Sequence, residues 1–168
     1  MKTRHIYLIL LGVFSISTYF IGSEMKKLVP SKEVIAFEFL WTRDNAQTLL
    51  SQSRWNHPDA SGSTQKERLT ANTYLDFLYI LSYTGLFLIL TRTLLGKNPS
   101  QIGLLYKAFM VAALVDIIEN ICLLQVLKEN YSIFATIMSL SATIKFGLLF
   151  TGLGTLIIVL VKTTLKYR

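Results

Sequence analysis

Four charged residues lie inside or at the edge of apolar stretches, where a charge is costly: Asp76, Asp116, Glu119 and Lys145. A charged side chain at the centre of a membrane helix costs about 2.5–3.5 kcal/mol on insertion scales. Asp116 and Glu119 are three residues apart, and Asn120 follows Asp116 by four, so one helix face is expected to carry all three. Such a group could hold an ion pair, move a proton or bind the polar end of a ligand.

Lys145 is expected to pair with Asp116. At about 1.5 Å of rise per residue, Asp116 lies about 16 Å from Leu127, the last residue of its apolar run. Lys145 lies about 18 Å from Ile133, the first residue of the next run. The short segment 128–132 joins these two ends, so the depths match. Because two carboxyls meet one ammonium there, the excess negative charge must take up a proton, face water or meet a cationic ligand.

A polar stripe is predicted on the preceding helix from residues that recur at helical spacing, namely Asn72, Asp76, Tyr79 and Tyr83. Asp76 lies near the start of the apolar run and costs less to bury. The stripe either lines an entrance to the deeper cluster or supplies tyrosines that hydrogen-bond to neighbouring helices. The deeper cluster, in turn, is either a ligand site or a polar clamp that only fixes helix packing. The candidate ligand-binding residues are Asn72, Asp76, Tyr79, Tyr83, Asp116, Glu119, Asn120 and Lys145.

Membrane helices are the elements that must position these residues. The 168 residues are 52% hydrophobic and only 16% charged, whereas soluble domains carry about 25% charged residues. The composition and the lengths of the apolar runs predict an all-α membrane protein, a four-transmembrane-helix bundle forming one domain over residues 1–168. The predicted spans are 6–22, 74–91, 108–127 and 133–161.

Segment 23–72 is predicted to be an extracytoplasmic insertion between the first two spans. Apolar residues alternate over 35–41, which favours a short extended segment. Thr42 can then cap a short helix that has Asp44 in its first turn and Trp55 on its apolar face, along the bilayer interface. Turn-forming residues at 56–63 end it, and a polar helical lead from about Thr64 introduces the second span.

Charge determines the expected orientation. The formal charge is +7, but basic residues flank the apolar runs as they do in membrane proteins, so no nucleic-acid partner is expected. Short segments at the two termini and after the second span concentrate Lys and Arg, which places both termini in the cytoplasm. The first run, 6–22, also has a rival interpretation as a cleaved signal peptide.

Metal and redox chemistry are not indicated. His5 and His57 belong to no ligand-spaced cluster, so no metal site is expected, and no pattern identifies a cofactor. Cys122 is the only cysteine and lies in an apolar run, so it is expected to be a buried, inert thiol.

From about residue 34 the chain resembles uncharacterised bacterial four-span integral membrane proteins. The resemblance rests on short motifs: Phe37-Glu38-Phe39, Trp55, Leu75-Asp76-Phe77-Leu78-Tyr79-Ile80, Asp116-x-x-Glu119-Asn120 and Lys145. It implies a four-span topology and, for a bacterial protein, the inner membrane, and it implies no activity.

Three functions follow from these patterns. The first is a membrane protein whose buried polar cluster binds a lipid-like or other amphipathic ligand. The second is a membrane-embedded enzyme with Asp116 or Glu119 as general base and Lys145 as charge stabiliser. The third is an accessory subunit of a membrane complex, in which Trp41 and Trp55 contact a partner protein. No recognised catalytic motif decides among them.

Overall fold

The computed structural model describes residues 2–58, 62–96 and 99–166. Over these ranges the chain contains only helices, so the predicted all-α fold class is confirmed. Four of the helices are long and apolar enough to cross a membrane, which indicates a membrane protein. The helices are α1 (Lys2–Leu28), α2 (Ser31–Glu38), α3 (Arg43–Leu50), α4 (Ser53–Asn56), α5 (Gln65–Leu95), α6 (Pro99–Leu127) and α7 (Phe134–Lys166).

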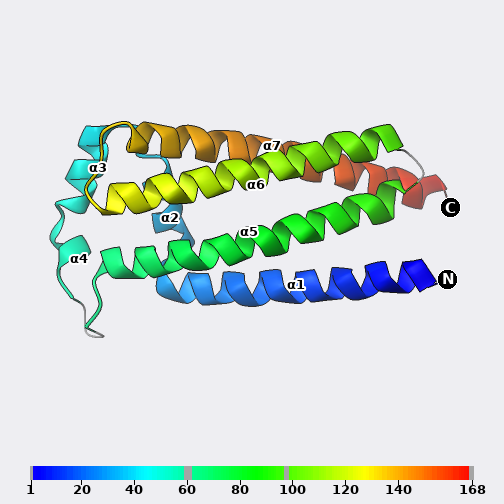
Figure 1. Cartoon of the computed structure of the whole chain (residues 1–168), viewed down its shortest axis with the longest axis horizontal. Coiled ribbons are helices and arrows are strands. Elements are labelled where there is room, and N and C mark those ends of the chain that lie inside the picture. The colour runs from blue at the N-terminus through cyan, green and yellow to red at the C-terminus, as the bar shows by residue number, and fades with distance from the viewer. Residues whose placement is uncertain (1, 59–61, 97–98, 167–168) are drawn as a thin grey trace.

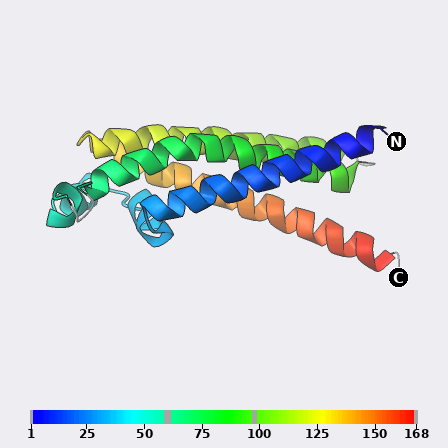
Figure 2. The ribbon, with the colours of Figure 1, turned by 90° about the horizontal axis from the view of Figure 1, so that it is seen from below.

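The four long helices lie side by side and alternate in direction along the chain (Figure 1). Helix α1 packs on α5, α5 packs on α6, and α6 packs on α7. As a result α1 begins and α7 ends at the same end of the molecule. Toward that end α1 and α7 diverge from each other (Figure 2).

The turn between α6 and α7 sets the register of the two helices that carry the predicted ion pair. Glu129 adopts a left-handed backbone conformation with φ 69°. This lets the Asn130 N–H donate to the Gln125 carbonyl at 3.0 Å, closing the end of α6. The connection is short, so residues equally far from the turn on α6 and α7 lie at the same depth.

The start of α5 follows the predicted polar lead. The Thr64 hydroxyl accepts from the backbone N–H of Glu67, and the Glu67 carboxylate accepts from the backbone N–H of Thr64. This capping box satisfies two backbone donors that would otherwise have no partner at the helix end. The helices exceed the predicted apolar runs at several ends, since α1 continues to Leu28 and α6 begins at Pro99, a residue favoured in the first turn.

The prediction of an extended segment over 35–41 is wrong. Most of this segment belongs to α2, in which the adjacent residues Phe37 and Glu38 are both buried while Ile35 is exposed. Val34, Phe37 and Glu38 have the spacing of one helix face, which the alternation of aromatic residues masked. A lone strand would also leave its backbone polar groups unpaired, because the described chain contains no second strand.

The insertion folds back against the long helices and shares their core. Phe37 and Trp55 are fully buried, with their ring centroids 5.5 Å apart. They belong to an apolar cluster that also contains Leu123 and Val126 of α6 and Met138 of α7. The predicted helix after Thr42 is present as α3, but Trp55 lies in the separate helix α4. Because Trp55 is buried, it offers no surface to a partner protein.

Two hydrogen bonds fasten the end of α2 to α7. The backbone N–H of Trp41 donates to Ser139 Oγ at 2.9 Å, and Thr136 Oγ1 donates to the Trp41 carbonyl at 2.9 Å. Trp41 itself adopts φ 59°, a conformation that costs free energy for a residue other than glycine. These contacts therefore hold a strained residue in place three positions after Glu38.

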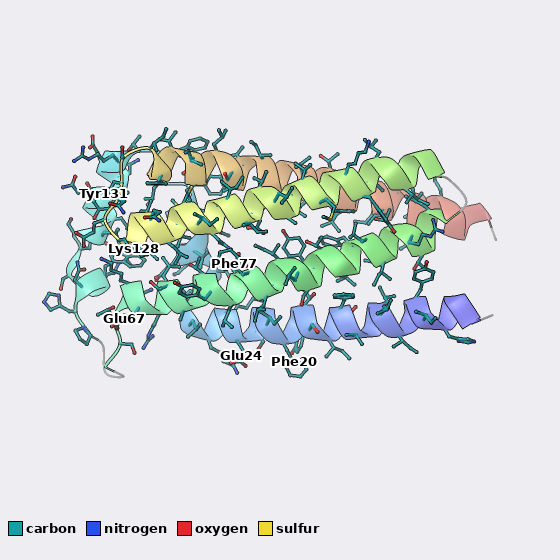
Figure 3. All side chains as sticks on the ribbon, viewed as in Figure 1. Phe20, Glu24, Glu67, Phe77, Lys128 and Tyr131 are labelled. Carbon is teal, nitrogen blue, oxygen red and sulfur yellow. The ribbon has the colours of Figure 1, made fainter. Side chains whose placement is uncertain are left out.

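The outer surface of the long helices is apolar. In Figure 3, Phe20 of α1 points away from the other helices, and it is one of many large apolar side chains exposed on α1, α6 and α7. Lys128 and Tyr131 mark the end of the molecule where α3 and α4 also lie. An exposed apolar band flanked by polar ends is the surface that a bilayer requires.

Replacing Gly152 with alanine is expected to loosen the contact between α6 and α7. A Cβ atom there would lie 2.6 Å from Cε1 of Phe109, whose side chain is fully buried and cannot withdraw. We expect the free energy of unfolding to fall by about 1–3 kcal/mol, measured by denaturant titration in detergent micelles. The control is Gly154→Ala, which meets nothing within 4 Å. Equal stability of the two variants would contradict this close packing.

Candidate functional site

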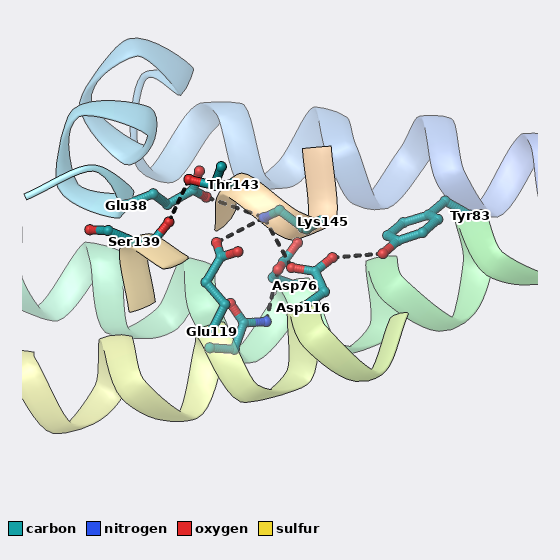
Figure 4. Close-up of polar contacts among 9 residues, drawn as sticks. Glu38, Asp76, Tyr83, Asp116, Glu119, Ser139, Thr143 and Lys145 are labelled. Carbon is teal, nitrogen blue, oxygen red and sulfur yellow. Dashed lines mark hydrogen bonds and ion pairs between the residues drawn. The ribbon is translucent and has the colours of Figure 1, made fainter. Parts of the chain in front are cut away.

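The predicted contact between Lys145 and Asp116 is present, and it is part of a larger group. Lys145 Nζ lies 3.1 Å from Asp116 Oδ1 and 2.8 Å from Glu119 Oε1, both on α6. It also lies 3.7 Å from Glu38 Oε1, at the end of α2. All four side chains are buried. Carboxyls from two elements, α2 and α6, thus converge on one ammonium group of α7 (Figure 4).

The polar stripe on α5 completes this group. The Tyr83 hydroxyl donates to Asp116 Oδ2 at 2.7 Å, so Asp116 bridges Lys145 and Tyr83 (Figure 4). Asn120 Nδ2 donates to Asp76 Oδ2 at 2.8 Å. Tyr83 therefore hydrogen-bonds to a neighbouring helix, which was one of the two alternatives, and its partner Asp116 belongs to the deeper cluster.

The other two residues of the stripe lie beside the cluster without joining it. Asn72 Nδ2 donates to the Met25 carbonyl at 2.8 Å and so ties α5 to the last turn of α1. The Tyr79 ring packs edge-on against Tyr83, with centroids 5.6 Å apart, and lies close to Gly22 of α1. These two side chains hold α1 against the site.

A cavity of about 290 Å³ adjoins the cluster. Of the eight predicted site residues, all but Glu119 line it. The remainder of its wall is largely apolar and aromatic, and comes from all four long helices and α2. These other lining residues are Met25, Val34, Glu38, Thr73, Phe87, Leu123, Phe146 and Leu149. The cavity thus has one strongly polar side and one apolar side.

A second, smaller cavity of about 180 Å³ continues the first beneath α2. The two share six lining residues, among them Glu38 and Phe146. The smaller cavity extends along the last turns of α1 to Lys26 and Ser31, where α1 ends and α2 begins. Together they form a path from the cluster toward the side of the molecule between α1 and α7.

Glu38 is the site residue that sequence reasoning missed. The alternating pattern placed its side chain on the opposite side of an extended segment from Phe37 and Phe39, whereas α2 directs it at Lys145. One signal could have found it, because Glu38 is the only charged residue between Lys32-Glu33 and Arg43 in an otherwise apolar segment. A lone acid in such a segment must either face water or find a buried partner.

Negative charge exceeds positive charge at the site. Four carboxyl groups surround one ammonium group, counting Asp76 with the three that contact Lys145. Glu38 Oε2 and Glu119 Oε2 are buried and have no hydrogen-bond partner among the described residues. An unpaired buried carboxylate oxygen is costly, so the site needs protons or an external donor. The group can therefore exchange protons or bind a ligand that supplies hydrogen-bond donors.

The Glu38→Gln variant is expected to make stability less dependent on pH. Burial raises the pKa of Glu38 above its ordinary value of 4.5, although Lys145 opposes this and Asp116 adds to it. A carboxyl whose pKa is raised on folding stabilises the fold at pH values below its ordinary pKa. This contribution is lost as the pH rises through the pKa that the group has in the folded state. We therefore expect the stability of the wild type relative to Glu38→Gln to fall as the pH rises above about 4.5, the ordinary pKa of the carboxyl group.

This pH dependence is measured by denaturant unfolding of both proteins in micelles. The control is Glu24→Gln, which removes an exposed carboxylate from α1. A constant difference between wild type and Glu38→Gln over that range would show that Glu38 titrates as it does in water.

No metal centre is suggested by the described part of the chain, where no three His, Cys, Asp or Glu side chains are grouped to hold an ion. Cys122 is buried with a free thiol.

No family model matches the sequence, and no curated protein or solved structure is significantly similar to it.

Proposed function

We propose that this protein is an integral membrane protein that binds an amphipathic molecule. Its polar end would lie against the carboxyl side of the cavity, at Asp76 and Asp116, and its apolar part would extend between α1 and α7 into the lipid. The observation that carries this proposal is the cavity of about 290 Å³, which joins a charged wall to an apolar one. Ligand sites typically combine apolar walls with a few convergent polar groups.

The position of the cavity also favours a ligand that arrives from the bilayer. Helices α1 and α7 are the outermost members of the series α1, α5, α6 and α7, and they diverge from each other (Figure 2). The smaller cavity leads toward that side, past Phe146. A lipid-like molecule could enter laterally there without carrying its apolar part through water.

The placement in the cell belongs to the same proposal. We propose the bacterial inner membrane, with both termini in the cytoplasm and the α2–α4 insertion on the outer face. The insertion would then cover the site from the outside, because Glu38 and Val34 of α2 line the cavity.

Native mass spectrometry of the protein released from nanodiscs tests the binding of an amphipathic molecule. We expect a bound lipid-like molecule on the wild type and at least about tenfold less of it on Asp116→Asn, which weakens the polar wall. Leu149→Trp fills the apolar wall and should also displace it, whereas Ile158→Trp places the same bulk on the exposed surface of α7 and should not. A wild-type protein without any bound molecule would count against the proposal.

A membrane enzyme is the second candidate, favoured by the unpartnered Glu119 Oε2 beside Lys145. A carboxylate in that position could act as a general base with Lys145 stabilising the developing negative charge. The test is Glu119→Gln, which keeps the shape of the side chain. If it folds and binds ligand like the wild type but fails to complement a deletion strain, the enzyme reading is supported, and full complementation removes it.

A further inference from the structure

We propose that the polar end of the ligand is a primary ammonium group, bound by Asp76. The inference rests on the proposed function and specifies the chemical class of the ligand. Two carboxyls on the wall of one cavity carry this inference. Among the described residues, Asp76 has no ion-pair partner, and the buried Glu38 has an oxygen without a hydrogen-bond partner.

Asp76 lacks a cation. Among the described residues it accepts one hydrogen bond, from Asn120 Nδ2 at 2.8 Å, and no basic side chain lies within ion-pair distance. Lys145, the basic residue of the site, is already engaged by three other carboxyls. Asp76 is partly accessible and lines the cavity, so a ligand can reach it.

Glu38 provides an independent indication. Its side chain is nine-tenths buried and lines the same cavity, and its Oε2 has no hydrogen-bond partner among the described residues. A buried oxygen of this kind requires a donor. The other cavity-lining carboxylate, Asp116, is already satisfied by Lys145 and by the Tyr83 hydroxyl. The site therefore lacks hydrogen-bond donors, and with four carboxyls to one ammonium group it also lacks positive charge.

The lack of donors and of positive charge selects among polar end groups. An anionic group would face Asp76 and Glu38 at close range and be repelled. A neutral hydroxyl gives a weaker hydrogen bond than a charged donor. A quaternary ammonium has the charge but no N–H to donate. A primary ammonium has the charge and three donors, and the aromatic side chains Tyr79 and Phe87 beside it tolerate a cation.

Binding of four probes with the same alkyl chain tests the inference. The probes are dodecylammonium, dodecyltrimethylammonium, dodecanol and dodecyl sulfate, added to the full chain in nanodiscs that contain only phosphatidylglycerol. We expect dodecylammonium to bind at least about tenfold more tightly than the other three, because a charge-assisted hydrogen bond of this kind is worth about one decade in affinity or more. Asp76→Asn should abolish this preference.

The matched control is Asp44→Asn, which removes one negative charge from exposed helix α3 and should leave the preference intact. Asparagine at position 76 keeps the shape of the side chain and can still accept from Asn120, so the variant is expected to fold, which thermal unfolding checks. Equal affinities for the four probes, or a preference retained in Asp76→Asn, would overturn the ammonium assignment.

A second arm identifies the source of the amine. In nanodiscs with equal phosphatidylethanolamine and phosphatidylglycerol, selective retention of phosphatidylethanolamine identifies a lipid headgroup, while retention of neither identifies a free amphipathic amine. Both results support the inference if dodecylammonium is preferred. If the probes bind without regard to their charge, the ammonium inference is overturned but the proposed function stands. If the wild type binds none of the probes and no lipid, both the inference and the proposed function are overturned.

Discussion

Replacing Lys145 with methionine is expected to lower the free energy of unfolding by about 3–5 kcal/mol, the cost of removing one partner from a buried ion pair. The substitution leaves Glu38, Asp116 and Glu119 buried around an apolar side chain. Each carboxyl must then take up a proton or draw water into the site, and both options weaken the native state. Denaturant titration in micelles measures the loss.

The control for this variant is Lys107→Met, which removes an exposed lysine from α6. It should change stability by less than about 0.5 kcal/mol, as surface substitutions usually do. If Lys145→Met were as stable as Lys107→Met, Lys145 would have to reach water, and the carboxyls would not depend on it.

Replacing Phe37 with alanine is expected to cost about 3–5 kcal/mol, the range for removing a buried aromatic ring. Phe37 is fully buried and packs on Trp55, in the apolar cluster that joins the insertion to α6 and α7. Its neighbour Glu38 depends on the same helix for its position beside Lys145. The variant should therefore lose ligand as well as stability. Unfolding in micelles and native mass spectrometry measure the two losses.

Lys32→Ala is the matched control, because Lys32 lies on the same short helix but is exposed and lines neither cavity. It should keep both the stability and the bound ligand. Protease digestion offers a further readout, since an insertion detached by Phe37→Ala should be cut faster than the wild type. An insertion that is cut equally fast in the wild type would mean that α2 does not cover the site.

The contact between Lys145 and Asp116 could be predicted from the sequence because it depends on length alone. Both residues lie at nearly equal distances from one short turn, and the rise of a helix converts those distances into depth. The shared face of Asp116, Glu119 and Asn120 on α6 could also be predicted, because residues three and four apart lie on the same face of any helix. The long apolar runs in turn predicted the four long helices.

Glu38 could not be placed in this way. Its position depends on the fold of the insertion, where short helices form and pack through contacts distant in sequence, such as those of Trp41 with Thr136 and Ser139. A short amphipathic segment can fit both the 3.6-residue period of a helix and the two-residue period of an extended chain. The extended conformation is excluded here by the fold, because the described chain offers no partner strand. Local pattern alone therefore gave the wrong element and hid a residue of the site.

The pairing of Asp76 with Asn120 also depends on tertiary structure. The sequence indicated that each lies on a polar helix face, but the relative rotation and depth of α5 and α6 are fixed by packing between helices. The same packing determines that Asn72 bonds to the end of α1 and not to the cluster. The residues that share one face of a helix can be predicted from their spacing. Contacts between the faces of two different helices require the structure.

A double-mutant cycle between Lys145 and Glu119 tests the central claim most directly, namely that these side chains form a buried ion pair at 2.8 Å. The cycle compares the free energies of unfolding of Lys145→Met, Glu119→Gln, the double variant and the wild type. We predict a coupling of at least about 1 kcal/mol, with the double variant losing less stability than the sum of the single variants. Losses that add to within about 0.3–0.5 kcal/mol would contradict the account, because additivity indicates residues that do not interact.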